Sequence, residues 1–185
     1  MQSEASSVLN EFRHGSPDRF EAAFETLFQA HQRAVYGWIL RIVRNPATAE
    51  DLTVETFWRI YRARSRFDPR RGFGPWARRI ATNLALDHLS TQRSSTTLAD
   101  DCPPACLRCS PPDPALAADV REKVAAAFGR LPVKLRATAT LAMIEETPYG
   151  EIAEALGISI GTVKSRVFRA VRLLRGDLQR MGVEP

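Results

Sequence analysis

The sequence has few of the features that mark membrane, secreted or disulfide-rich proteins. No apolar run approaches the roughly 20 residues of a membrane-spanning helix. The opening stretch, MQSEASSVLNEF, lacks the basic start and apolar core of a signal peptide. Cysteine occurs only 3 times in 185 residues, an odd number that argues against a disulfide scaffold. We therefore expect a soluble cytoplasmic protein.

Patterns typical of enzymes are also missing. The three histidines, His14, His31 and His88, are scattered along the chain. No Ser/His/Asp set, no phosphate-cradling glycine loop and no carboxylate pair at a meaningful spacing is visible. The sequence therefore predicts neither a catalytic site nor a cofactor, and we expect that the protein is not an enzyme.

What the chain does have is an excess of basic residues and a helical period. Lysine and arginine outnumber the acids by 26 to 21, which gives a net charge of +5 and suits an anionic partner. Apolar residues recur at spacings of three and four, and no alternating strand pattern appears. The predicted fold class is all-α, and the chain is long enough for two small helical domains.

The order of the segments gives the predicted domains. After a loose arm over 1–17, helices are expected from Asp18 to Asn45-Pro46, from about Thr48 to Arg64 and from about Pro75 to Thr91. Periodicity then fails in a stretch rich in serine, threonine and proline. We expect an N-terminal domain over 18–93, a flexible linker over 94–112 and a C-terminal domain over 113–181.

The C-terminal stretch from Tyr149 to Arg175 predicts a helix-turn-helix. Gly157 interrupts one helical pattern, and Ser159 stands where the second helix needs an N-cap. Residues 161–175 contain no acid, so the second helix is expected to present a positive outward face of the kind that enters a DNA major groove.

Four segments of the chain are EIAEALGISIGTVKSRVFRA, LPVKLR, AEDLTVETFWRIY and FGPWARRIATNLALDHL. Their sequences resemble the extracytoplasmic-function group of bacterial RNA polymerase sigma factors. The resemblance implies a protein that binds core RNA polymerase and promoter DNA, recognises the minus-thirty-five and minus-ten elements, and helps to open the duplex. By analogy, an anti-sigma partner is also expected.

The resemblance and the local chemistry together suggest the residues of each site. For the minus-thirty-five element we expect Arg166 and Lys164 near base edges and Arg169 and Arg172 on phosphate. The full set for that element is Thr162, Lys164, Ser165, Arg166, Arg169 and Arg172.

For the minus-ten element, residues 59–80 offer eight arginines and one acid, and the Gly/Pro loop over 67–75 is expected to form a base pocket with stacking rings. Trp76 is also a candidate, although core packing suits its position better. The set is Phe67, Phe73, Trp76, Arg79, Asn83 and Asp87. The segment that resembles the polymerase-docking helix offers Glu50, Asp51, Leu52, Glu55 and Phe57. The acids are expected to steer association with the polymerase, and the apolar side chains to supply binding affinity.

Two alternatives stay open. A stand-alone helix-turn-helix regulator would bind DNA without polymerase, usually as a dimer, but no heptad seam is visible. The cysteines Cys102, Cys106 and Cys109 have a metal-like spacing, so a zinc or thiol sensor that acts through DNA binding is the second alternative. The fourth ligand of such a site is not evident, and thiols in a mobile linker are the simpler interpretation.

Overall fold

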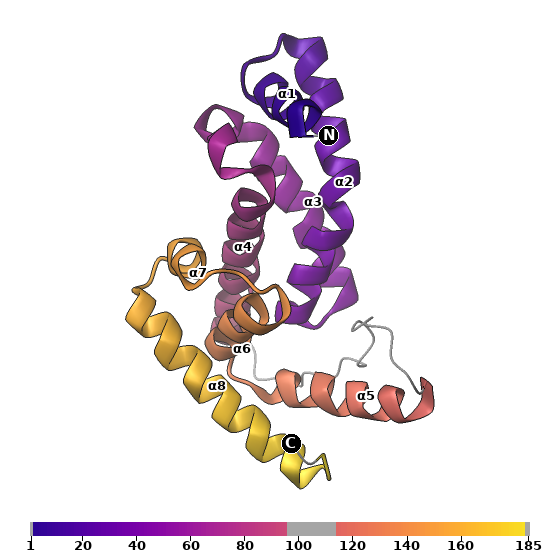
Figure 1. The fold of residues 1–185 in the computed structure, drawn as a ribbon, viewed down its shortest axis with the longest axis vertical. Helices are drawn as coiled ribbons and strands as arrows, with labels where there is room; N and C mark the ends of the chain where they lie inside the picture. Colours follow the sequence, from indigo (N-terminus) through magenta and orange to yellow (C-terminus); the bar gives the residue numbers. More distant parts are fainter. Residues whose placement is uncertain (1, 96–113, 184–185) are drawn as a thin grey trace. The chain divides into compact units, whose positions relative to one another are not determined.

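The computed structural model describes residues 2–95 and 114–183, and every regular element in those ranges is helical. In chain order the elements are α1 (Gln2–His14), α2 (Pro17–Val43), α3 (Pro46–Arg62), the 3-10 turns η1 (Arg64–Arg66) and η2 (Pro69–Arg71), α4 (Phe73–Ser95), α5 (Pro114–Arg130), α6 (Val133–Ala139), the π-helical turn η3 (Thr140–Ile144), α7 (Tyr149–Leu156) and α8 (Ile160–Arg180) (Figure 1). The predicted all-α class is confirmed. The chain divides into two compact units, Met1–Asp87 and His88–Pro185.

In the first unit, α2 and α3 form an antiparallel pair joined by a tight corner. The buried stripe of α2 is Phe20, Ala23, Leu27, Val35, Trp38, Ile39, Ile42 and Val43. Arg44 ends α2 in the left-handed conformation, with φ of 61°. Asn45 then caps α3, because its side chain accepts a hydrogen bond from the Thr48 backbone N–H at 3.0 Å. Pro46 follows in the first turn of α3, where its missing N–H costs nothing.

The expected loose arm at the N-terminus is wrong, because residues 2–14 form α1 and pack against α2 (Figure 1). The cause is Phe12, which is 0% exposed and anchors α1. Gly15 makes the turn that follows: a Cβ there would lie 2.4 Å from the carbonyl oxygen of Glu11, so a larger residue would disturb the corner.

Residues 64–72 are more ordered than a loop, since they form η1 and η2 around an aromatic cluster. We define this cluster as Phe12, Phe20, Phe24, Phe67, Phe73 and Trp76. The ring of Phe12 lies 5.5 Å from Phe67 and 5.8 Å from Phe73, both edge-on. The ring of Phe67 lies 5.0 Å from Trp76. Aromatic pairs favour such edge-on and tilted geometries, so α1, the 3-10 turns and the start of α4 share one apolar core.

The second unit has its core between α8 and the four preceding elements. Ala127, Leu131, Ala139, Ala170 and Leu174 form one cluster, and Leu141, Ile152, Ala153 and Val163 form another. A charged side chain is also buried here: Arg136 on α6 is 2% exposed, and its guanidinium donates a hydrogen bond to the carbonyl oxygen of Gly129 at 3.0 Å. That bond ties α6 to the end of α5.

The helix-turn-helix is present as the sequence predicts. Gly157 ends α7 with φ of 62°, a left-handed conformation that glycine adopts without strain. Ser159 caps α8, because its hydroxyl accepts a hydrogen bond from the Thr162 backbone N–H at 3.2 Å. Val163 then packs against Ile152 of α7 within the second core cluster, which fixes the angle between the two helices.

Candidate nucleic-acid and polymerase surfaces

The outward face of α8 carries most of the residues expected at the minus-thirty-five element. Lys164, Ser165, Arg169 and Arg172 are exposed, and Val163, Ala170 and Leu174 are buried on the opposite side. The guanidinium of Arg169 donates a hydrogen bond to the Ser165 hydroxyl at 3.0 Å, which holds both side chains together on the surface. Thr162 is half-buried in the cap, with its hydroxyl 2.9 Å from that of Ser159.

Arg166 and Phe168 differ from the expected arrangement of this face. Arg166 is half-buried, and at 100° per residue it lies roughly 160° around the helix from Phe168. It therefore flanks the core-facing side, and its expected contact with a base edge stays a prediction. Phe168 is 70% exposed, although sequence reasoning gave it no role. An apolar residue inside a run of cations was the signal that could have drawn attention to it.

On α4, Arg79, Asn83 and Asp87 are exposed and follow one another at intervals of four residues, so they share one helix face. Their side chains form a polar row along the middle of the helix. Trp76, one turn before Arg79, is half-buried and belongs to the aromatic cluster, as its expected packing role suggests. This row is the part of the expected minus-ten surface that is exposed to solvent.

Phe67 and Phe73 do not have the surroundings expected of base-stacking rings. Both are buried in the aromatic cluster beneath α1, where they meet Phe12 rather than solvent. Without a rearrangement of α1, no base can reach either ring. The expected base pocket over 67–75 is therefore filled by protein.

The arginines of residues 59–80 are also more engaged than their number suggests. Arg64 lies over the ring of Phe20 at 4.0 Å, and Arg78 lies over the ring of Trp38 at 4.8 Å. Arg70 donates two side-chain hydrogen bonds to Asp68, at 3.1 and 3.0 Å, and these bonds lower the pKa of that carboxyl. Some of these arginines therefore make contacts within the protein that stabilise the fold locally.

On α3, the acids of the expected docking face are open to solvent, but the apolar residues are not. Glu50 and Asp51 are exposed, and Glu55 pairs with Arg59 at 2.8 Å. Leu52 and Phe57 are buried in the core, so the surface that this helix offers to a partner is formed by other side chains.

The exposed apolar side chains of α3 are instead Val54, at 70%, and Trp58, at 54%. They are four residues apart and lie on one face. Phe57 is adjacent to Trp58 in sequence but is buried, so the packing of α3 separates it from the exposed pair. The α3 surface, as we use the term, comprises Glu50, Asp51, Val54, Glu55 and Trp58.

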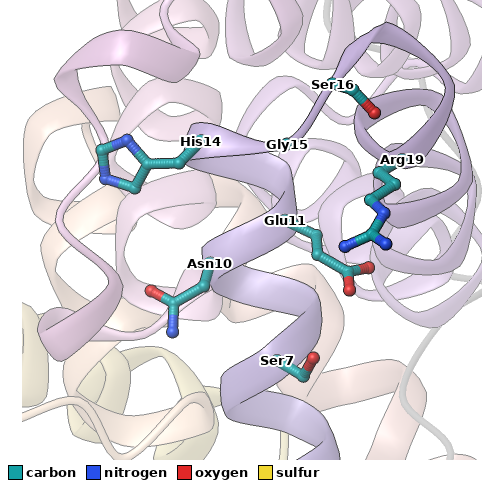
Figure 2. A pocket seen from close by; sticks show the side chains of 7 residues that line it. All are labelled: Ser7, Asn10, Glu11, His14, Gly15, Ser16 and Arg19. Carbon is teal, nitrogen blue, oxygen red and sulfur yellow. The ribbon is translucent and has the colours of Figure 1, made fainter.

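A hollow of about 550 Å³ lies at the corner between α1 and α2, and Figure 2 shows the seven residues that line it. Glu11 and Arg19 lie on one side of the chain there, and His14 and Asn10 lie on the other (Figure 2). The side chains do not converge on a common point, and no expected site residue lines the hollow. Within the described ranges no group of His, Cys, Asp or Glu side chains could hold a metal ion. The three cysteines lie outside the described residues.

Comparison with known proteins matches both units. The sigma-70 region 2 family matches residues 27–95, and the sigma-70 region 4 family matches residues 121–174. The RNA polymerase sigma factor CarQ of Myxococcus xanthus is 35% identical over 95% of this chain and 98% of its own length. The ECF RNA polymerase sigma factor SigW of Bacillus subtilis is 30% identical over 85% of this chain and 89% of its own. The chain belongs to the extracytoplasmic-function sigma factors.

Sigma factors are transcription initiation factors that have no enzymatic activity of their own. They bind core RNA polymerase and promoter DNA, and both are partners of this sigma factor. Its fold is also that of a solved structure, CnrH in complex with the cytosolic domain of CnrY, with a TM-score of 0.68, 23% identity and coverage of 95% of this chain and 97% of that one. No helix in the described part of this sigma factor is long and apolar enough to cross a membrane.

Proposed function

We propose that this sigma factor directs core RNA polymerase to its own set of promoters, in the cytoplasm, and opens the DNA there. The C-terminal domain, over 113–181, binds the minus-thirty-five element, and the N-terminal domain, over 18–93, binds and melts the minus-ten element. The linker over 94–112 joins them. The observation that carries this proposal is the outward face of α8, where Lys164, Ser165, Arg169 and Arg172 stand exposed on the second helix of a well-capped helix-turn-helix.

At the minus-ten element, the polar row of α4 is the proposed contact. Arg79, Asn83 and Asp87 offer a cation, an amide and a carboxylate, which together can serve a phosphate and the polar edges of unpaired bases. Phe67 and Phe73 support this surface from within by holding the start of α4 against α1. Their part in melting is therefore to position α4, not to stack on bases.

The α3 surface is the proposed polymerase contact. Val54 and Trp58 provide the apolar contact, and Glu50 and Asp51 beside them provide charge that steers association. An exposed tryptophan and valine flanked by acids serve no purpose on a polyanion such as DNA. This surface therefore favours a factor that works on polymerase over a regulator that binds DNA alone.

We also propose an anti-sigma partner. A solved structure with this fold, RpoE of Bartonella quintana, was determined in complex with the anti-sigma factor NepR, with a TM-score of 0.68 and 20% identity to this chain. Regulation of this kind would keep the sigma factor from polymerase until a signal arrives.

The test is transcription in vitro from fragmented genomic DNA, with core polymerase alone, with this sigma factor alone and with both. Sequencing of the transcripts should show defined start sites only when both are present. Tight and sequence-specific binding by the free protein, unchanged by core polymerase, would contradict the proposal and support a stand-alone regulator.

A further inference from the structure

The exposed indole of Trp58 on α3 is stacked on a second ring of the same helix. Trp58 is 54% exposed, yet its ring lies 6.0 Å from that of Tyr61, with only 7° between the two planes. Side chains of an α-helix lean toward its N-terminus, over the residues three and four positions earlier. Tyr61 follows Trp58 by three residues, so it lies where it can support the indole from the C-terminal side.

Tyr61 is itself held by rings of the neighbouring helix α2. Its ring lies 5.3 Å from that of Phe24 and 4.8 Å from that of Phe20, both in edge-on geometry. Phe20 is 1% exposed and also contacts Phe12 of α1 and the guanidinium of Arg64, at 5.6 and 4.0 Å. The position of the Tyr61 ring is therefore set by the core of the first unit.

A support of this kind restricts the side-chain rotamers of Trp58. An exposed tryptophan loses rotational freedom when an interface immobilises it, and that loss weakens binding. The stacking energy of an aromatic pair corresponds to about a twofold to tenfold preference for the stacked rotamer. The ring of Tyr61 thus orders the indole before any partner binds it.

We propose that Tyr61 is a positioning residue for the contact with core polymerase, because it holds the indole of Trp58 in the orientation that the polymerase binds. The inference rests on the proposed function, in which Trp58 is an apolar contact of the α3 surface. Tyr61 is half-buried, and in this role it acts through Trp58.

A double-mutant cycle on the whole chain tests the coupling between the two rings. Affinity for core polymerase is measured for wild type, Tyr61→Leu, Trp58→Ala and the double variant. Tyr61→Leu should weaken binding by about threefold to tenfold when Trp58 is present, and by less than about twofold when it is absent. Tyr61→Phe keeps the ring and should bind within about twofold of wild type.

The orientation of the indole is measured separately, by fluorine NMR of protein that contains 5-fluorotryptophan. The chain has three tryptophans, and Trp58→Phe identifies the signal of Trp58. That signal should shift and sharpen in Tyr61→Leu, because the indole loses its stacked neighbour, and should keep its wild-type position in Tyr61→Phe. The signals of Trp38 and Trp76 report on the rest of the unit and should stay unchanged.

Ile60→Val is the control for destabilisation without loss of the stack. Ile60 is 0% exposed on the same helix, so the change should lower the free energy of unfolding. It should leave both the affinity for core polymerase and the Trp58 signal as they are in wild type. A purely structural role of Tyr61 would give this same pattern for Tyr61→Leu.

The inference is overturned if Tyr61→Leu binds core polymerase as tightly as wild type, or loses as much affinity without Trp58 as with it. It is also overturned if Tyr61→Leu leaves the Trp58 signal unchanged, or if Tyr61→Phe loses as much affinity as Tyr61→Leu. Failure of the proposed function gives a different result, because Trp58→Ala would then bind core polymerase as wild type does.

Discussion

The ring of Phe12 stands edge-on to the ring of Phe67, with centroids 5.5 Å apart and the planes at 73°. One residue comes from α1 and the other from the segment between η1 and η2, so the contact closes the N-terminal helix over the arginine-rich turns. Phe12 makes similar contacts with Phe73 and Trp76 at the start of α4. The segment that leads into the polar row of α4 is therefore held by a helix more than fifty residues earlier in the chain.

This contact predicts a large loss of stability when Phe12 is shortened. Phe12→Ala should lower the free energy of unfolding by about 3–5 kcal/mol, because the ring is fully buried and its removal leaves a cavity. Urea denaturation measures the loss. Asn10→Ala, on the exposed side of α1, is the matched control and should change stability by less than about 0.5 kcal/mol. Equal effects of the two changes would show that α1 is not anchored by its ring.

The α3 surface predicts a loss of polymerase binding without a loss of stability. Trp58→Ala should weaken binding to core polymerase by about 2 kcal/mol, roughly 30-fold, if the indole is an interface anchor. Val54→Ala should act in the same direction but less strongly. Phe57→Leu provides the comparison. Because the ring of Phe57 is buried, this change should lower the free energy of unfolding more than it lowers the affinity for core polymerase. Fluorescence anisotropy with labelled protein gives the affinity, and an unchanged value for Trp58→Ala would refute this assignment.

Replacement of Arg172 is expected to change the salt dependence of promoter binding rather than its sequence preference. Its guanidinium is exposed about two turns beyond the start of the base-facing part of α8, where phosphate is the expected contact. Arg172→Ala should weaken holoenzyme binding to all promoters alike and reduce the slope of log K against log salt by about 0.9. A loss confined to promoters with one particular base would instead place Arg172 at a base edge.

The partly buried side chain of His31 should make the stability of the fold depend on pH. Burial lowers the pKa of His31, whose ring lies 4.9 Å from that of Phe73. Because the unfolded chain then binds a proton more readily than the folded one, the free energy of unfolding should fall as pH drops below about 6.5. The loss continues until pH passes the lowered pKa of the folded state. His31→Gln should give a shallower dependence between pH 7 and pH 5 in urea titrations, and identical slopes would show that other groups dominate.

The order of the helices could be predicted from the sequence because its signals are local. Asn45-Pro46, Gly157 and Ser159 mark helix ends by their own backbone and capping chemistry, and the structure places them there. The N-terminal helix α1 was missed because residues 1–17 are mostly polar and end in the breaker HGSP, although Val8, Leu9 and Phe12 recur at helical spacing. The partners that bury Phe12 lie far away in sequence.

The faces of the helices were harder to predict than their positions. Phe57 and Trp58 are adjacent, and only the packing of α3 against α2 decides that the first is buried and the second exposed. Likewise, Phe67 and Phe73 in a Gly/Pro loop suggested a pocket, but α1 supplies the ring that fills it. The half-buried position of Arg166 could have been predicted from its spacing along α8, since it lies beside the buried stripe of Val163 and Ala170.

The polar row of α4 also sets a length scale for the minus-ten contact. From Arg79 to Asp87 a straight helix rises about 12 Å, at 1.5 Å per residue. Successive phosphates of one strand in duplex DNA are about 3.4 Å apart along the axis, and those of an unpaired strand are further apart, so the row can follow at most three or four nucleotides. Under the proposed function, α4 would therefore sample a short window of single-stranded DNA, and any longer recognition at the minus-ten element would be shared with other elements of the holoenzyme.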